Sequence, residues 1–177
     1  VPPTIRGELV WCQGYSEPGA GSDLANVQTR ATPDGDDFVI DGQKIWTTTA
    51  HLSKMMFALV RSEAGAEKHA GLSYVLIPMD APGIEVRPLG TMTGASEFNQ
   101  VFFTGVRVPQ SNVVGRRGEG WKIANTTLKH ERNMLASSAQ LEAAVLGLVA
   151  LMRQASVDGR RAIDSPLLAF SASRLTT

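Results

Sequence analysis

Apolar and polar positions alternate with a period of two over roughly the first two-thirds of the chain. Val27, Thr29 and Ala31 alternate with polar neighbours, and such alternation is typical of strands with one buried face. The run Pro-Asp-Gly-Asp at residues 33–36 is a turn cluster, and Asp41-Gly42 predicts a two-residue hairpin between β-prone runs. Short strands with turns between them predict an antiparallel β-barrel or sandwich; the candidate strands are residues 38–40, 44–48, 55–61, 72–77, 84–88 and 99–108.

The period changes to that of a helix after Gly115. A linker at residues 116–120 precedes apolar residues in steps of three, four or seven from Trp121 to Val149, which predicts one long helix to about Gln154. Residues 157–159 end this helix, and Ser165-Pro166 predicts the start of another. The fold class is therefore α+β, with a β-domain at residues 1–115 and helices at residues 116–177.

The long helix has an apolar face that nothing else in the sequence covers. The chain also begins at Val1 rather than Met. We therefore expect it to be part of a longer polypeptide whose remaining helices, or another subunit, cover that face.

Composition excludes several classes of function. Of the 177 residues, 43% are hydrophobic, and 17 basic residues balance 17 acidic ones, so no basic field attracts nucleic acid or an anionic membrane. One cysteine, Cys12, rules out an intramolecular disulfide, and the three histidines lack the spacing of a metal site. The longest apolar tract, residues 143–152, is too short to cross a bilayer, and no signal peptide pattern is present. We expect a cytoplasmic protein, or one of the mitochondrial matrix if the source is eukaryotic.

Residues 13–23 (Gln-Gly-Tyr-Ser-Glu-Pro-Gly-Ala-Gly-Ser-Asp) form a candidate ligand-binding loop. Gly19 and Gly21 let the backbone approach a ligand closely, and Ser16 and Ser22 supply hydroxyls. An ordinary glycine turn would have the same composition. The spacing is neither a Rossmann fingerprint nor a P-loop.

Residues 44–49 (Lys-Ile-Trp-Thr-Thr-Thr) form a second candidate. In a strand Trp46 and Thr48 point to the same face, so that an indole lies beside a hydroxyl. This pair suits a flat heteroaromatic ring, and a buried core Trp with β-prone threonines would suit the same pattern.

Together, these motifs resemble the acyl-CoA dehydrogenase family. Residues 16–23 are followed, about twenty residues later, by Gly-Gln-Lys-x-Trp-x-Thr at residues 42–48; further matches follow in family order at residues 82–84, 98–109 and 118–121. The likeness covers nearly all of residues 5–152. It implies a middle β-domain and a helical bundle with FAD between them, and α,β-dehydrogenation of an acyl-CoA thioester with hydride transfer to flavin N5.

The resemblance also implies roles for individual residues. Ser16 matches the hydroxyl that bonds the pyrimidine side of the flavin, Trp46 the indole that covers the ring, and Thr48 the hydroxyl near N5. The full cofactor-binding set is Gln13, Tyr15, Ser16, Gly21, Ser22, Trp46, Thr47 and Thr48, and the substrate-binding set is Ser22, Ser62 and Arg132. Implied partners are an acyl-CoA substrate, an electron-transfer flavoprotein as electron acceptor, and other subunits in a homo- or hetero-oligomeric dimer or tetramer.

Three positions depart from the family pattern. Gln13 replaces an aromatic residue seen in some members, and Thr49 replaces a frequent Asn. Residues 155–161 lack the Arg-x-x-Phe-Gly run whose Arg reaches the FAD of a neighbouring subunit; either that contact is missing here, or Arg160 or Arg161 substitutes for it.

Glu131 is the candidate catalytic base. Leu128, Glu131 and Leu135 are spaced i, i+3 and i+7, so the carboxylate interrupts the apolar face of the helix and is partly desolvated. Leu-Lys-His-Glu-Arg at residues 128–132 also matches the Leu-x-x-Glu-Arg setting of the isovaleryl-CoA and long-chain types. An ion pair of Glu131 with Arg132 or Lys129, or a carboxylate beyond residue 177, is the competing interpretation.

Two other functions remain open from the sequence. An acyl-CoA oxidase, a nitroalkane oxidase or a flavin-dependent monooxygenase would share this architecture. A non-catalytic β-sandwich binding module with a helical arm belongs to another class. In every flavoenzyme interpretation we expect the 177-residue chain alone to bind FAD weakly and to have little activity.

Overall fold

The structure is a computed structural model that describes residues 2–135, 138–157 and 159–166. It divides into two compact units, residues 1–127 and residues 128–177. Each unit is considered by itself below.

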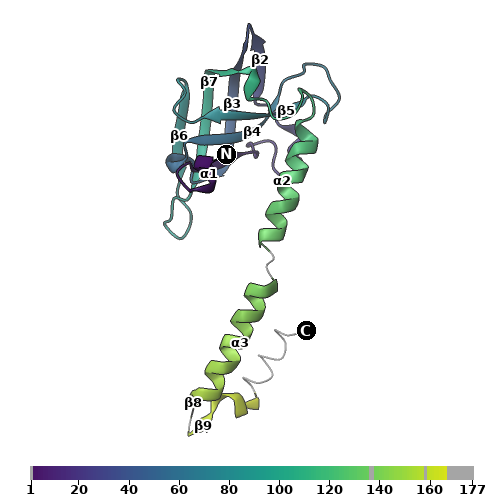
Figure 1. Cartoon of the computed structure of the whole chain (residues 1–177). Coiled ribbons are helices and arrows are strands. Elements are labelled where there is room, and N and C mark those ends of the chain that lie inside the picture. Colours follow the sequence, from purple (N-terminus) through teal and green to yellow (C-terminus); the bar gives the residue numbers. More distant parts are fainter. Residues whose placement is uncertain (1, 136–137, 158, 167–177) are drawn as a thin grey trace. The chain divides into compact units, whose positions relative to one another are not determined.

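Within the described part of the first unit, seven strands form one curled sheet in the order β1-β4-β2-β3-β7-β6, with β5 paired to β4 (Figure 1). The predicted β-domain followed by helices is confirmed. The sheet is mixed rather than antiparallel throughout, because β1 runs parallel to β4. The strands are β1 (Trp11–Gly14), β2 (Arg30–Asp34), β3 (Asp37–Thr48), β4 (Met55–Arg61), β5 (Leu72–Pro78), β6 (Ile84–Leu89) and β7 (Phe98–Pro109).

Short helical elements lie before, between and after the strands, and two longer helices follow β7. The N-terminal and 3-10 elements are α1 (Pro2–Ile5), η1 (Leu24–Asn26), η2 (Ala50–Leu52), η3 (Gln110–Asn112) and η4 (Ala162–Asp164). The longer helices are α2 (Gly120–Leu135) and α3 (Ser138–Gln154), and a two-residue hairpin of β8 (Ser156–Val157) and β9 (Arg160–Arg161) follows them. In place of one predicted helix from Trp121, two helical stretches are described, and residues 136–137 between them lie outside the described residues. A second helix was predicted to start at Ser165-Pro166, and the residues that follow also lie outside the described residues.

The core of the first unit is built from the alternating positions that the sequence indicates. Phe38 and Ile40 of β3, Val60 of β4 and Val101 and Val106 of β7 are completely buried in one cluster. Burial of a side chain of this size contributes about 1.5–3 kcal/mol each relative to exposure, so this cluster is the main source of stability in the β-domain.

The predicted hairpin at Asp41-Gly42 is wrong. The turn lies at Gly35-Asp36, where Asp34 pairs with Asp37, and β3 continues without a break through Asp41 and Gly42. Gly42 has φ +148°, and a Cβ there would lie 2.6–2.9 Å from atoms of Thr29. A glycine in a strand also marks the close approach of another backbone, and that is its role here.

Asp41 serves the neighbouring strand instead of a turn. Its Oδ1 accepts a hydrogen bond of 2.8 Å from the backbone N–H of Gly105 in β7. The register between β3 and β7 shifts between Ile40 and Gly42, opposite Gly105, whose φ is +61°. The Asp-Gly pair therefore faces a β-bulge in β7, a feature with the same residue preference as a turn.

The start of α2 is fixed to the β-domain by close backbone packing. A Cβ on Gly120 would lie 2.5 Å from the carbonyl carbon of Ser73, and a Cβ on Gly118 would lie 2.9 Å from Ala70 O. The Glu119 carboxylate accepts a hydrogen bond of 3.1 Å from Arg116 N just before the helix begins. Gly-Glu-Gly is therefore a tight contact between helix and sheet rather than a flexible linker.

Candidate flavin site

The loop at residues 13–22 leaves β1 and folds back on itself. Glu17 and Ala20 exchange two backbone hydrogen bonds of 3.0 Å, which close a small turn around Pro18 and Gly19. Gly19 and Gly21 are exposed, and a Cβ on either would meet nothing within 4 Å. Ser16 is half-buried and Ser22 is exposed, so the loop presents open backbone and hydroxyl groups at the surface.

This loop lies directly against the strand that carries Trp46. The backbone N–H of Ile45 donates a hydrogen bond of 2.9 Å to Ser16 O. The Lys44 ammonium donates to Tyr15 O at 3.1 Å and to Glu17 Oε1 at 2.7 Å. The structure therefore brings together the two motifs that the sequence singled out.

Trp46 has an exposed side chain because β3 bulges at its C-terminal end. The register with β7 shifts between Lys44 and Thr47, and Trp46 takes φ +59°, a conformation rarely adopted by an aromatic residue. Trp46 is 59% exposed, and its indole contacts only one described ring, that of Phe98, in a T-shaped arrangement with 6.0 Å between centroids. Thr48 is also exposed, whereas Thr47 between them is buried.

Side chains from the neighbouring strand hold this bulge in place. Asn99 Nδ2 donates to Thr47 O at 2.9 Å and to Glu97 O at 3.2 Å, while Asn99 Oδ1 lies 3.1 Å from His51 Nδ1. Thr49 follows with φ +54°. A β-branched residue is disfavoured in that conformation and Asn tolerates it better, which explains physically why Asn would suit position 49.

Two further residues of the predicted cofactor set, Tyr15 and Thr47, have buried side chains and do not lie on the open surface. The Tyr15 side chain is buried, with its hydroxyl donating to the Tyr74 hydroxyl at 3.2 Å and its ring edge-on to Phe57. The Thr47 hydroxyl is shielded from solvent and has no hydrogen-bond partner among the described residues. Gln13, half-buried on β1, pairs with Phe57 of β4.

The predicted substrate residues Ser22 and Ser62 lie in two loops that an ion pair connects. Lys68 Nζ is 2.6 Å from Asp23 Oδ2, next to Ser22. Ser62 itself is buried, with its hydroxyl 2.6 Å from Ser73 Oγ, which also accepts a hydrogen bond from Gly118 N. Ser62 therefore has a structural role at the junction of β4, β5 and the start of α2.

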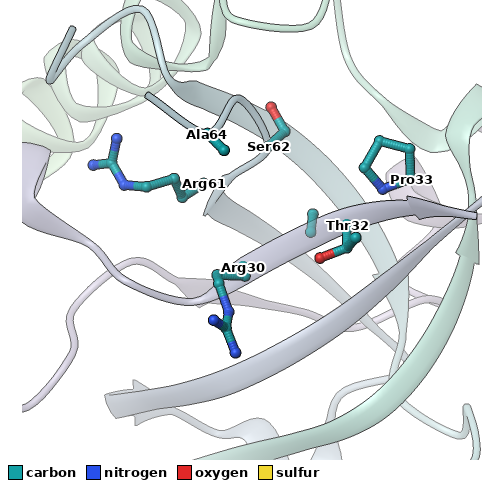
Figure 2. A pocket seen from close by; sticks show the side chains of 7 residues that line it. Arg30, Thr32, Pro33, Arg61, Ser62 and Ala64 are labelled. Carbon is teal, nitrogen blue, oxygen red and sulfur yellow. The ribbon is translucent and has the colours of Figure 1, made fainter. Parts of the chain in front are cut away.

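A small cavity adjoins Ser62. It holds about 160 Å³ and is lined by Arg30, Ala31, Thr32, Pro33, Arg61, Ser62 and Ala64. Figure 2 shows the guanidinium groups of Arg30 and Arg61 extending in different directions from their strands. Ligand sites for drug-sized molecules measure about 300–1,000 Å³, so this cavity is too small for a flavin, and no predicted cofactor residue lines it.

Glu131 and Arg132 belong to the second unit. Glu131 is half-buried on α2, and its Oε2 is shielded from solvent without a hydrogen-bond partner among the described residues. Arg132 and Lys129 are exposed, and neither forms an ion pair with Glu131 within the part of α2 that the structure describes. A shielded carboxylate oxygen with a free lone pair is able to accept a proton from a ligand.

Glu17 and Lys44 are the site residues that the sequence reasoning missed. Both occur inside the motifs, but neither received a role. Lys44 shares the strand parity of the buried Phe38 and Ile40, and a lysine in a core-facing position is the signal that predicts a buried partner.

The exposed groups of the first unit fit an isoalloxazine ring and its tail. The indole of Trp46 offers an uncovered aromatic face, Ser16 and Thr48 offer hydroxyls for ring heteroatoms, and the open backbone of Gly19–Gly21 leaves room for close approach. By contrast, no group of three or more His, Cys, Asp or Glu residues among the described residues could hold a metal ion. No helix in the described ranges is long and apolar enough to cross a membrane.

Comparison with known proteins agrees with this assembly of motifs. The family model described as "Acyl-CoA dehydrogenase, middle domain" matches residues 12–106. The chain belongs to the acyl-CoA dehydrogenase family. Members of this family are flavin-dependent oxidoreductases.

Relatives of known name extend the likeness over the whole chain. Acyl-CoA dehydrogenase IpdE1 of Mycobacterium tuberculosis is 48% identical over 178 residues, which cover 99% of this chain and 45% of that protein. Acyl-CoA dehydrogenase FadE26 of the same organism is 37% identical over 99% of this chain and 44% of its own length. The chain thus spans less than half the length of these acyl-CoA dehydrogenases.

Solved structures of the family have the same fold. The Tcur3481-Tcur3483 steroid ACAD is 37% identical, with a TM-score of 0.83 over 99% of this chain and 45% of that one. The ChsE4-ChsE5 complex from Mycobacterium tuberculosis is 36% identical, with a TM-score of 0.85 and the same coverage.

Proposed function

We propose that the protein to which this chain belongs catalyses FAD-dependent α,β-dehydrogenation of an acyl-CoA thioester. The observation that carries the proposal is the direct contact between the loop and the β3 bulge, through Ile45 N and Ser16 O, beside an exposed Trp46 and Thr48. An exposed indole held at positive φ is costly for a free surface and useful against a planar ligand. In this proposal residues 1–115 form the flavin- and substrate-binding β-domain, and residues 116–177 form the beginning of the C-terminal helical bundle.

The flavin-binding residues act by different contacts. Trp46 covers one ring face, while the hydroxyls of Ser16 and Thr48 bond ring heteroatoms. Gly21 and Ser22 supply exposed backbone and a hydroxyl. The side chains of Gln13, Tyr15 and Thr47 are half-buried or buried, so these residues contribute mainly by supporting the exposed residues of the site. When bound, FAD supplies the acceptor for the hydride that leaves the substrate β-carbon.

Glu131 is the proposed base that removes the α-proton. Its support is the family setting at residues 128–132 together with its half-buried position and shielded, unpartnered Oε2. The carboxylate takes the proton, and the electron pair of the broken α-C–H bond becomes part of the new double bond. A base in such surroundings is held away from bulk water, which favours proton transfer from the substrate.

The substrate is an acyl-CoA, and we propose a steroid-derived acyl group as the narrower class. Its support is the likeness to a structure described as a steroid ACAD. Ser22 and Arg132 are exposed and able to contact a CoA thioester directly, whereas Ser62 is buried and its hydroxyl lies 2.6 Å from the buried Ser73 Oγ, so its proposed contribution is to hold the start of the loop after β4 in place.

The working protein is an oligomer of like or unlike subunits that passes electrons to an electron-transfer flavoprotein. Likeness to the two-component ChsE4-ChsE5 complex supports an assembly of unlike chains.

The test is Glu131→Gln in the full-length protein, with Glu142→Gln as its control. Glu142 is an exposed carboxylate on α3 and carries no proposed role. An acyl-CoA added without oxygen should bleach the flavin absorption of the unchanged protein and of the Glu142 variant. Glu131→Gln should keep the flavin and lose the bleaching, and rapid bleaching by that variant would remove Glu131 from the mechanism. Admission of air then separates a dehydrogenase from an oxidase, because only an oxidase recovers its absorption quickly with peroxide release.

A further inference from the structure

A buried ion pair crosses between the two motifs of the proposed flavin site. The side chains of Lys44 and Glu17 are 0% and 6% exposed, and Lys44 Nζ lies 2.7 Å from Glu17 Oε1. The pair joins the loop after β1 to the middle of β3, three residues before the buried Thr47 and two before the exposed Trp46.

Every strong hydrogen-bonding position of the pair is used. The three N–H groups of Lys44 donate to Glu17 Oε1, to Tyr15 O at 3.1 Å and to Leu59 O at 2.6 Å. The Glu17 carboxylate also accepts from Thr29 N at 2.9 Å and from Gln28 N at 2.6 Å. Two side chains thereby connect the loop, β3, β4 and the segment that leads into β2.

Such a pair contributes little net stability, but it fixes the arrangement of the chain segments that it connects. Desolvation of two charges offsets much of their attraction, and apolar replacements of similar volume are often equally stable. Fully satisfied buried polar networks, in contrast, fix one arrangement of the chain. Burial lowers the pKa of Lys44 to about 8, and the facing carboxylate of Glu17 opposes that shift, so Lys44 remains charged at neutral pH.

We propose that Glu17 and Lys44 are positioning residues that fix residues 15–22 against β3 and so set the spacing between Ser16 and Trp46. This inference rests on the proposed flavin site. Neither side chain can touch a ligand, because both are buried. Their effect on a cofactor is therefore exerted through the backbone of the loop, by way of Tyr15 O and the turn closed by Glu17 and Ala20.

The experiment uses the full-length protein with both charges removed, Glu17→Gln with Lys44→Met. This double variant leaves no lone buried charge and is expected to fold. Its control is Glu85→Gln with Arg87→Met, which removes an ion pair of 2.7 Å that is more than half exposed on β6. Two quantities are measured: amide hydrogen exchange of residues 15–22 without cofactor, and the Kd for FAD.

The double variant is expected to exchange the loop amides about tenfold faster or more, with unchanged exchange in the β3–β7 ladder at Phe38 and Val108. Its Kd for FAD is expected to rise by a similar factor and the visible band of bound flavin to change shape, while the control variant matches the unchanged protein. Glu17→Asp keeps the charge on a shorter side chain, and its loop exchange rate and Kd for FAD are expected to lie between those of the unchanged protein and the double variant. This single variant keeps the test possible if the double variant does not fold.

Unchanged loop exchange, or unchanged FAD affinity and spectrum in both Glu17 variants, would overturn the inference while leaving the flavin site intact. Uniformly faster exchange across the whole sheet would also overturn it, because the pair would then serve overall stability. If the unchanged full-length protein binds no FAD, the proposed function itself is wrong, and this result is obtained before any variant is compared.

Discussion

The hydroxyl of Thr47 offers a quantitative test of how the β3 bulge is built. Thr47 is 1% exposed, and its Oγ1 has no hydrogen-bond partner among the described residues. Thr47→Val replaces this hydroxyl with a methyl group of similar size, so the change leaves no cavity and breaks no hydrogen bond of the Thr47 side chain to a described residue. A buried polar group without a partner costs about 1–3 kcal/mol. We expect the substitution to raise the free energy of unfolding by about 1 kcal/mol.

Thr29→Val is the matched control. Thr29 is also 1% exposed, but its Oγ1 donates to Gln43 O at 3.3 Å. Loss of that hydrogen bond should lower the free energy of unfolding by about 1 kcal/mol. The two substitutions are chemically identical, and they should differ by about 2 kcal/mol because only one hydroxyl has a partner.

Urea unfolding of the cofactor-free protein measures both variants. The unfolding midpoint should rise for Thr47→Val and fall for Thr29→Val, with the same dependence on urea concentration in each. Destabilisation by Thr47→Val of the same size as by Thr29→Val would refute the reasoning, since the Thr47 hydroxyl would then have a partner such as an ordered water. A gain without FAD that becomes a loss with FAD would instead assign the hydroxyl to the cofactor.

Three further predictions concern the β-domain. Burial raises the pKa of Cys12 to about 11, so the thiol should react with a disulfide reagent at neutral pH far more slowly in the folded protein than in urea; equal rates would contradict its burial. Gly42→Ala should lower the free energy of unfolding by at least about 1 kcal/mol, because the added Cβ would overlap Thr29. An unchanged free energy of unfolding would show that β3 shifts freely at this position. Burial opposes ionisation of Glu17, but the charge and hydrogen bond of Lys44, together with hydrogen bonds from Thr29 and Gln28, outweigh it and hold the pKa of Glu17 below its ordinary value. That stability is fully present above about pH 4.3 and is lost as pH falls through the lower folded-state pKa, so the acid side of the stability curve should be steeper than in the Glu17→Gln, Lys44→Met variant.

The sequence predicted the strands well where burial alone sets the pattern. Residues 55–61 form β4 with the predicted bounds, β5 and β6 each extend one residue further at one end, and β7 extends one residue further at both ends. Alternation is clear in the first half of β7 and at the start of β4, where Met56 and Ala58 lie in the core. Strand β5 begins with four consecutive buried residues, and its short apolar run between turn residues is the signal that identifies it.

Prediction failed where one local pattern serves two structures. Asp41-Gly42 has the composition of a tight turn, but its use is decided by contacts with Thr29 and Gly105, which are distant in sequence. The parallel pairing of β1 with β4 is also set by a connection of some forty residues that no local signal encodes. Composition near a glycine cannot separate a turn from a bulge without the partner strand.

The candidate site shows the same division between local and distant information. The motifs identified the loop and the Trp46 strand, and the hydrogen bond between Ile45 and Ser16 places them together. The bulge that exposes Trp46 was not predicted, since its cause is the register with β7 and the support of Asn99. The pairing of Lys44 with Glu17 also required the folded chain, because 27 residues separate them.

The most direct test of the central claim is the affinity of the full-length protein for FAD after Trp46→Ala. The exposed indole contributes little to the core, so the variant should fold normally. Loss of aromatic stacking, worth about 1–3 kcal/mol per ring, should raise the Kd for FAD at least about fivefold. Ile5→Ala, which truncates another side chain that is mostly exposed, should leave the Kd unchanged. An unchanged Kd for Trp46→Ala, in a protein that otherwise binds FAD, would contradict the account, because the loop and the bulge would then not form the flavin site.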